Sequence, residues 1–241
     1  MDTLLNFLNN NLMTILGGAG GGFIGLFVSW REFSKIFRMF RTSTGEIASL
    51  PADEQVEIIG KADGAAGLQS PITKTPCVLW QVTVSERRSS GKNSRWVVVY
   101  RNSSTEPFDV YDGTGRMRVH PGPQMELILR DDVSKSSGLF YSLDEQTQTV
   151  LNEMGVATKG FLNLNKAMRV QERYVEPGDQ IYLLGKTSLS SGARVMDSEA
   201  PLIVSDQSEL QLVGRFSWRV IANAVVGVII GVALAFFFAN R

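Results

Sequence analysis

The sequence has little of the residue types that build metal centres and covalent frameworks. Its 241 residues include one cysteine, Cys77, and one histidine, His120. A single cysteine excludes an intramolecular disulfide framework, and one cysteine with one histidine cannot form a zinc cluster. The sequence also lacks a P-loop, a G-x-S-x-G elbow and an H-E-x-x-H motif. We therefore expect no metal ion or other cofactor, no catalytic residues and no enzymatic activity.

Net charge is also absent, because 24 Lys and Arg balance 24 Asp and Glu. This balance does not favour a nucleic-acid partner. The charges are nevertheless distributed unevenly. Residues 42–214 hold 17 basic and 22 acidic side chains, so the ends of the chain carry a basic surplus. Basic residues beside apolar segments are typical of membrane proteins.

Two long runs lack charge. Residues 220–239 (VIANAVVGVIIGVALAFFFA) would form a helix roughly 30 Å long, which is the thickness of a bilayer core. Residues 12–30 (LMTILGGAGGGFIGLFVSW) form the other run, after a tail at 1–11 that lacks the positive charge of a signal peptide. Both runs predict transmembrane helices. The alternative for 220–239 is a buried core helix.

Glycines recur at helical spacing in both runs. Gly17, Gly21 and Gly25 share one helical face, and Gly227 and Gly231 repeat the spacing. Small residues at this spacing let membrane helices approach closely. We predict that the two stripes pack together, within one chain or between chains of a homo-oligomer. The alternative is that they reflect the ordinary composition of membrane helices.

A basic amphipathic segment follows the first run. Residues 31–54 form this juxtamembrane segment and a polar linker, and 213–219 form a second, shorter basic segment. The cations of the first segment are Arg31, Lys35, Arg38 and Arg41. With the phenylalanines between them, they predict a helix that lies against anionic membrane lipid. The alternative is that the helix continues the span and docks on the central domain.

The spacing of apolar runs and turn residues in 55–212 predicts a mainly β domain. Short runs of β-branched and aromatic residues are interrupted by turn residues every eight to twelve positions, which is typical of an antiparallel sandwich or barrel. The expected strands lie at 55–62, 77–87, 95–101, 107–112, 116–120, 124–130, 166–175, 180–187, 193–197 and 202–205. Ser142 and Glu145 form a capping box that predicts a short helix to about Met154.

The aromatic residues of the second and third expected strands are candidates for a binding surface. Trp80, Trp96 and Tyr100 would pack in the core or, if exposed together, form a possible interaction surface. Candidate catalytic side chains are few. An alternative hypothesis places an unrecognised enzyme site around Asp112, His120 and Asp179.

Several segments together resemble the GIDE domain family over residues 55–212. They are SPITKTPCVLWQVTVSER, PFDVYDGTGRMRVHP, ERYVEPGDQIYLLGKT and PLIVSDQSE. The resemblance implies a β-rich domain between two membrane spans, as in the membrane-anchored mitochondrial ubiquitin ligase Mulan. Such ligases carry a zinc-binding RING domain after the second span, and one cysteine cannot form it. We therefore expect a RING-less prokaryotic relative without ubiquitin-ligase activity.

These observations predict a two-span membrane protein whose domain binds another protein at the membrane surface. Binding of lipid or another hydrophobic ligand is the alternative, with an unrecognised enzyme as a further one. The cations after the first run, with Arg215 and Arg219 before the second, predict a cytoplasmic domain at a prokaryotic inner membrane. The resemblance to Mulan implies the opposite side, and we favour the charge distribution.

Overall fold

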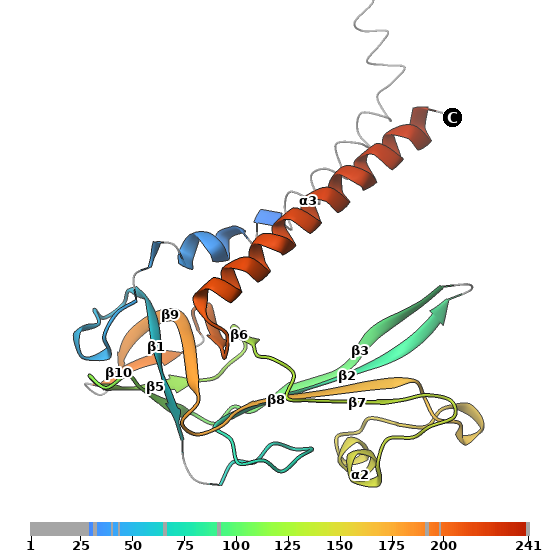
Figure 1. The fold of residues 1–241 in the computed structure, drawn as a ribbon, viewed down its shortest axis with the longest axis horizontal. Helices are drawn as coiled ribbons and strands as arrows, with labels where there is room; N and C mark the ends of the chain where they lie inside the picture. Colours follow the sequence, from blue (N-terminus) through green and yellow to red (C-terminus); the bar gives the residue numbers. More distant parts are fainter. Residues whose placement is uncertain are drawn as a thin grey trace, which may run out of the picture. The chain divides into compact units, whose positions relative to one another are not determined.

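The computed structural model describes residues 29–30, 33–39, 41–42, 44–64, 67–90, 93–190, 193–197 and 199–239 (Figure 1). The chain forms two compact units. Unit 1 comprises the two ends of the chain, up to residue 43 and from Glu209 onward, and unit 2 comprises Thr44–Ser208. The predicted span at 12–30 lies outside the described residues except at its last two positions.

Unit 2 is mainly β, as predicted. Its strands are β1 (Gln55–Asp63), β2 (Leu79–Ser90), β3 (Asn93–Ser103), β4 (Phe108–Tyr111), β5 (Arg116–His120), β6 (Met125–Ile128), β7 (Val133–Ser137), β8 (Met168–Val175), β9 (Gln180–Ser190), β10 (Ala193–Asp197) and β11 (Leu202–Ser205). Its helices are η1 (Ile47–Ser49), α2 (Glu145–Glu153) and η2 (Phe161–Asn163).

Five strands close into a barrel. β1 pairs with β4, β4 with β5, β5 with β10, β10 with β9, and β9 returns to β1. β11 and β6 extend the sheet from β9. This ring order is that of a five-stranded Greek-key barrel of the OB type. Two pairings, β10 with β5 and β11 with β6, are parallel, so the prediction of an antiparallel sheet was correct only in part.

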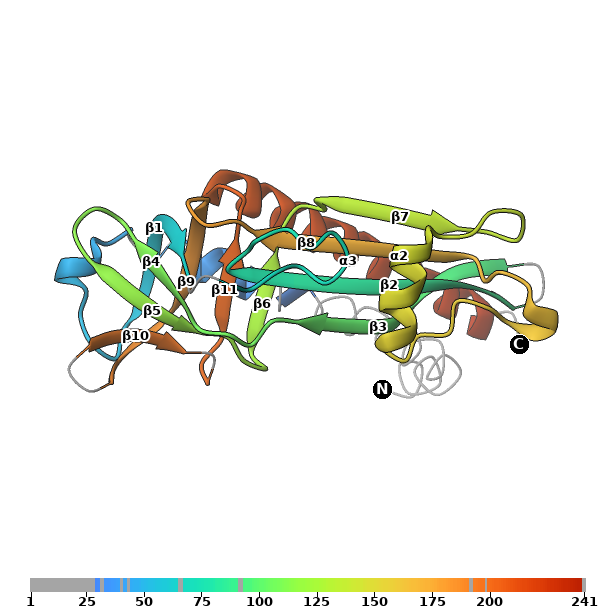
Figure 2. The same ribbon diagram turned by 90° about the horizontal axis from the view of Figure 1, so that it is seen from below.

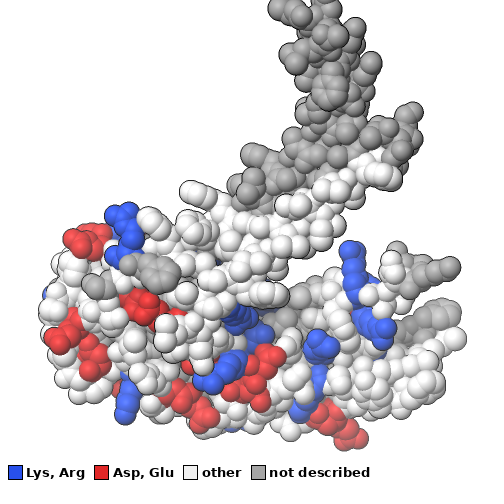
Figure 3. Space-filling model, turned by 45° about the horizontal axis from the view of Figure 1, so that its top comes forward, with Lys and Arg blue, Asp and Glu red and all other residues white. Residues whose placement is uncertain are grey.

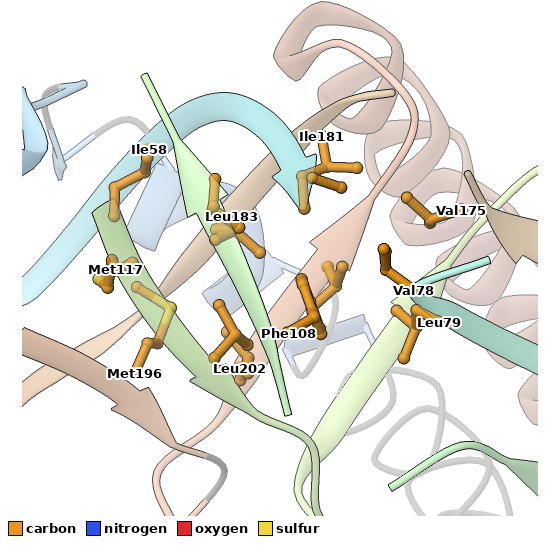
Figure 4. Packing of buried hydrophobic residues seen from close by; sticks show 14 of the residues in the cluster. Ile58, Val78, Leu79, Phe108, Met117, Val175, Ile181, Leu183, Met196 and Leu202 are labelled. Atoms are coloured by element: carbon orange, nitrogen blue, oxygen red, sulfur yellow. The ribbon is translucent and has the colours of Figure 1, made fainter. Parts of the chain in front are cut away.

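The barrel interior is filled by side chains that alternate along each strand. In β4, Phe108 and Val110 are buried, whereas Tyr111 is exposed, which is the two-residue period of a strand with one buried face. Figure 4 shows Phe108, Met117, Leu183 and other members of this core pointing toward one another. Apolar burial of this kind is the main stabilising contribution to the barrel.

Residues 44–54 contribute to the same core. They were expected to form a polar linker, but Ile47 and Leu50 are buried. The backbone N–H of Ile47 donates to Asp112 Oδ2 over 2.7 Å. The segment is therefore part of the barrel.

A second sheet, which we call the long sheet, has the strand order β3-β2-β8-β7 and extends from the barrel (Figure 1). Its strands are inserted between barrel strands, β2 and β3 after β1, and β7 and β8 before β9. The helix α2 covers one of its faces, where Val82, Val84, Leu151, Met168 and Val170 form a buried cluster.

Two local predictions for this region were wrong. β7 was not expected, because its sequence VSKSS has low β-propensity, and it forms by pairing with β8. The N-cap of α2 is Asp144 and not Ser142, since the Asp144 carboxylate accepts a hydrogen bond from the Thr147 N–H.

Unit 1 contains the helix α3 (Glu209–Ala239). Within the described part of the chain, its segment Glu209–Ile230 is the one helix long and apolar enough to cross a membrane. The predicted run 220–239 lies in this helix. Side chains along it are exposed, including Val228 at 64% and Ile229 at 61%. The end of the first predicted run contacts it, because Ser29 Oγ donates to the Val220 carbonyl over 3.3 Å.

Candidate functional site

One face of the long sheet carries a cluster of arginines. Residues directly opposite each other on neighbouring strands share a face, and Ser85 lies opposite both Val98 and Arg169. This face is opposite the one that α2 covers, since the neighbouring Val84 and Val170 belong to the α2 cluster. We call it the arginine face. Its residues are Arg87, Trp96, Val98, Arg101, Arg169 and Arg173.

The arginines differ in their partners. Arg173 is neutralised, because its Nε donates to Asp131 Oδ1 over 2.6 Å. Arg87 Nε donates to the uncharged Ser94 Oγ. Considering only the residues that the structure describes, Arg87, Arg101 and Arg169 have no carboxylate within ion-pair distance. Three positive charges on this face are therefore available to an external anion.

An apolar centre accompanies these charges. The Arg169 guanidinium lies over the Trp96 ring, 4.6 Å from its centroid. Trp96 is 42% exposed and Val98 is 50% exposed. Stacking on the indole holds the guanidinium in place while its N–H groups remain able to bind a carboxylate. The face thus combines apolar contact area with fixed hydrogen-bond donors for an anion.

The arginine face belongs to a larger division of charge inside unit 2. The barrel segments 44–64, 105–132 and 176–208 contain 6 basic and 16 acidic residues. The long-sheet segments 65–104 and 133–175 contain 11 basic and 5 acidic residues. Figure 3 shows more red side chains over the barrel and more blue ones over the long sheet. The net charge of the whole chain is zero and therefore does not reveal this division between the barrel and the long sheet.

The aromatic candidates from the sequence fall on different faces. Trp80 and Tyr100 pack against the cluster beneath α2, whereas Trp96 lies on the arginine face. They therefore do not form one exposed surface together. Sequence reasoning missed Arg169 and Arg173. Their alternation with Gln171 along β8 was the signal that could have indicated a polar, basic strand face.

The other sequence candidates lie in unit 1. Lys35 Nζ is 5.2 Å from the Phe216 ring centroid, and Arg41 lies over Phe37 at 5.3 Å. Arg38 belongs to the same helical segment, and Arg31 lies outside the described residues. Contact of these cations with lipid remains a prediction.

The glycine-stripe prediction concerns residues that are only partly described. Gly227 and Gly231 lie four residues apart in α3, and Gly227 is buried. Gly17, Gly21 and Gly25 are outside the described residues. Packing between the two stripes therefore remains a prediction.

The residues of the enzyme alternative do not converge. Asp112 lies in the turn before β5, whereas His120 is the last residue of that strand, and Asp179 accepts a hydrogen bond from the Glu176 N–H within its own turn. Across the described positions no group of three His, Cys, Asp or Glu side chains could hold a metal ion. Burial, assisted by the negative charges of Glu172 and Glu176, raises the pKa of the Cys77 thiol to about 11. A thiol with such a pKa is a poor nucleophile at neutral pH.

Asp112 has a structural role. Partial burial acts to raise the pKa of its carboxyl group, but hydrogen bonds from Ile47, Thr114 and Gly115 outweigh burial and lower the pKa from 3.8 to about 2. The folded pKa is lower than the unfolded value, so ionised Asp112 stabilises the fold above about pH 4. That contribution is lost as the pH falls from about 4 toward about 2.

We therefore expect Asp112→Asn to lower stability at neutral pH and to flatten the acid limb of the stability curve. Urea unfolding measured at a series of acidic pH values would check this. Substitution of the exposed Glu106 by glutamine is the control, because its carboxylate has no comparable set of donors. An Asp112→Asn curve that falls with acid as steeply as the wild-type curve would contradict the prediction.

A model of the GIDE family, described as E3 Ubiquitin ligase, matches residues 80–236. Comparison with curated proteins and with solved structures gave no match. The family match begins in β2, includes the arginine face and α2, and ends within α3. Because it covers more than half of the sequence, the chain belongs to the GIDE family.

Proposed function

We propose that this GIDE-family chain is a membrane-anchored protein-interaction module whose arginine face binds an acidic segment of another protein. The observation that carries the proposal is the arrangement of Arg87, Arg101 and Arg169 around the exposed Trp96 and Val98. Arginine and tryptophan are among the residue types that contribute most at protein interfaces. Complementary charge would orient an acidic partner on this face.

Anchoring is proposed from the properties of α3. A core helix of a soluble protein buries most of its apolar side chains, but only 11% of the membrane-compatible segment of α3 is buried. A bilayer would cover such a surface. Residues 12–30 are proposed as a second span by their composition. The basic flanks favour a cytoplasmic location for unit 2.

We further propose that these residues carry no ubiquitin-ligase chemistry of their own. The family description names an E3 ligase. Transfer through a cysteine needs an accessible thiolate, whereas Cys77 is buried and its pKa is about 11. A zinc-based RING needs several cysteine and histidine ligands, and the sequence has one of each. The proposed role is therefore to bind and hold a partner.

Photo-crosslinking in membranes tests the binding role. A benzophenone amino acid in place of Val98 should give a discrete adduct with one protein. Arg101→Glu and Arg169→Glu together should reduce the adduct at least tenfold, because each reversed charge repels an acidic partner. Mass spectrometry of the adduct should identify an acidic segment at the crosslink.

The matched control is Lys61→Glu, which reverses an exposed charge on the barrel. It should leave the Val98 adduct unchanged. A crosslink that survives reversal of both arginines, or a crosslinked segment without acidic residues, would refute the proposal.

A further inference from the structure

We infer that the end of the long sheet farthest from the barrel inserts apolar loops into a bilayer that contains anionic lipid. We call this end the distal tip and define it by Leu139, Phe140, Tyr141, Leu162 and Leu164. The inference rests on the proposed membrane anchoring and extends it, because it assigns a lipid contact to unit 2 in addition to α3.

Two loops meet at the distal tip. The loop at residues 138–141 follows β7, and the loop at 161–164 precedes β8. Ser137, at the end of β7, lies opposite Met168, at the start of β8, so the loops are neighbours. Arg87 N donates to the Ala167 carbonyl over 2.8 Å, which brings the end of the β2–β3 hairpin beside them. Figure 2 shows these segments at one end of the long sheet.

The first loop presents apolar side chains at its apex. Gly138 and Tyr141 exchange two backbone hydrogen bonds, of 2.9 and 3.2 Å, that close the turn. A Cβ atom at Gly138 would lie 2.7 Å from Tyr141 Cε1, so glycine allows the tyrosine ring to pack over the turn. Leu139 is 54% exposed and Phe140 is 94% exposed. Clustered apolar exposure of this kind marks an interaction surface.

The second loop exposes leucine at a strained position. Leu162 has φ +56°, which is uncommon for a residue with a branched side chain, and it is 75% exposed. The loop is closed by a hydrogen bond of 2.8 Å from Gly160 N to the Leu164 carbonyl, and Leu164 is 51% exposed. The loop therefore directs its leucines outward even though the backbone at Leu162 is strained.

Positive charges surround these apolar residues. Arg88 lies directly opposite Arg95 on the neighbouring strand, and Glu86 lies 3.5 Å from Arg88 as its one ion-pair partner among the described residues. Lys159 is exposed beside the second loop. Arg88, Arg95 and Lys159 together outnumber the Glu86 carboxylate, so lipid phosphates could bind beside them. Apolar and aromatic tips surrounded by basic residues are typical of proteins that enter the headgroup region of a membrane.

The direct connection of unit 2 to α3 favours the membrane as the binding partner of the distal tip. α3 begins at Glu209, directly after the last residue of unit 2, Ser208. The same continuous helix includes the proposed span, so no flexible linker separates unit 2 from the bilayer. A partner protein would have to be captured from solution, whereas the bilayer is present from the moment of insertion.

The test uses the full chain reconstituted in phosphatidylcholine vesicles, with and without phosphatidylglycerol. In a Cys77→Ala background, single cysteines at Phe140, Ile229 or Glu106 are labelled with a nitrobenzoxadiazole dye. We expect the dye at Phe140→Cys to show blue-shifted, several-fold stronger emission that nitroxide lipids quench and that phosphatidylglycerol increases. The dye at Ile229→Cys reports the anchoring of α3, and the dye at Glu106→Cys should report water.

Each outcome decides the inference. Bilayer signals at both Ile229→Cys and Phe140→Cys support it. A bilayer signal at Ile229→Cys with an aqueous signal at Phe140→Cys overturns the insertion of the distal tip and leaves the proposed anchoring by α3 intact. Aqueous signals at both positions overturn both. Strong Phe140→Cys emission that nitroxide lipids do not quench would indicate contact with protein, and would also overturn the inference.

Variants of the neighbouring loop provide a second test. Leu162→Asp with Leu164→Asp should abolish most of the emission gain of the dye at Phe140→Cys, because charged loops resist entry into the bilayer. Leu189→Asp, at a barrel position 59% exposed, is the matched control and should change nothing. Equal effects of the two kinds of substitution would overturn the assignment.

Discussion

Replacing Glu172 by leucine should lower the free energy of unfolding of unit 2 by about 3–5 kcal/mol. Glu172 is 0% exposed. Its Oε1 accepts the Ile72 N–H over 2.7 Å, and its Oε2 accepts the Thr73 N–H over 3.0 Å and the Thr73 hydroxyl over 2.7 Å. The leucine variant would leave the buried Ile72 N–H without its acceptor, which costs roughly 1–3 kcal/mol, and would remove the acceptor of the partly buried Thr73 N–H and hydroxyl.

The effect should extend beyond the lost hydrogen bonds. Glu172 holds Ile72, which is 1% exposed and belongs to the cluster beneath α2. The Ile72 carbonyl accepts a hydrogen bond from Gln146 in α2 over 2.9 Å. Loss of the Glu172 carboxylate would therefore weaken the packing of both the loop that contains Ile72 and the helix α2.

Urea unfolding of the detergent-solubilised chain, followed by tryptophan fluorescence, measures this loss. Glu153→Leu removes the same charge from an exposed position of α2 and should change stability by no more than about 0.5 kcal/mol. Glu172→Gln, which retains an acceptor oxygen, should fall between the two. If Glu172→Leu and Glu153→Leu lowered the free energy of unfolding equally, the hydrogen bonds of Glu172 would not have the assigned stabilising role.

Truncation of Phe108 to alanine should destabilise the barrel by about 3–5 kcal/mol. Phe108 is 1% exposed in the main core cluster, and packing fixes its neighbours on several strands, so the cavity would collapse only in part. Tyr111→Ala on the same short strand is the matched control, because Tyr111 is 48% exposed. We expect a loss below about 1 kcal/mol there.

The same urea titration separates these two variants. The midpoint should fall for Phe108→Ala without a change in slope, since the surface exposed on unfolding is nearly the same. Similar midpoints for Phe108→Ala and Tyr111→Ala would show that the barrel interior tolerates the loss of the ring, and that the assigned packing is wrong.

Local patterns predicted the strands well where turn residues bound them. β5, β10 and β11 have the predicted bounds, because short alternating runs end at glycine, proline or polar residues. The turn glycines Gly113 and Gly178 have φ of +92° and +95°, as tight turns require. β7 could not be predicted, since VSKSS acquires its conformation by pairing with β8, more than 30 residues away. The parallel pairings of β5 and β6 depend in the same way on long-range topology.

The arginine face depends on a β-bulge in β3, which residue spacing in the sequence does not reveal. Trp96 and Arg101 are five residues apart, so a regular strand would place them on opposite faces. The β2–β3 register shifts between Val84 and Ser85, which adds one residue to β3 and turns Arg101 to the Trp96 face. A bulge of this kind has no clear signature in a single sequence. Trp96 could therefore be proposed as a candidate, but the placement of Arg101 on the same face could not.

The closure of the barrel by β1 and β9 has a consequence for how the protein is made. Gln55 pairs with Lys186, so the edge of β1 that pairs with β9 must wait until almost all of unit 2 has left the ribosome. At roughly 5–20 residues per second, the interval from Asp63 to Ser190 lasts roughly 6–25 s. α3 follows soon after, beginning at Glu209. Translation that stalls before β9 would therefore leave nascent chains with an open sheet edge, and these are the chains that chaperones at the membrane would have to protect.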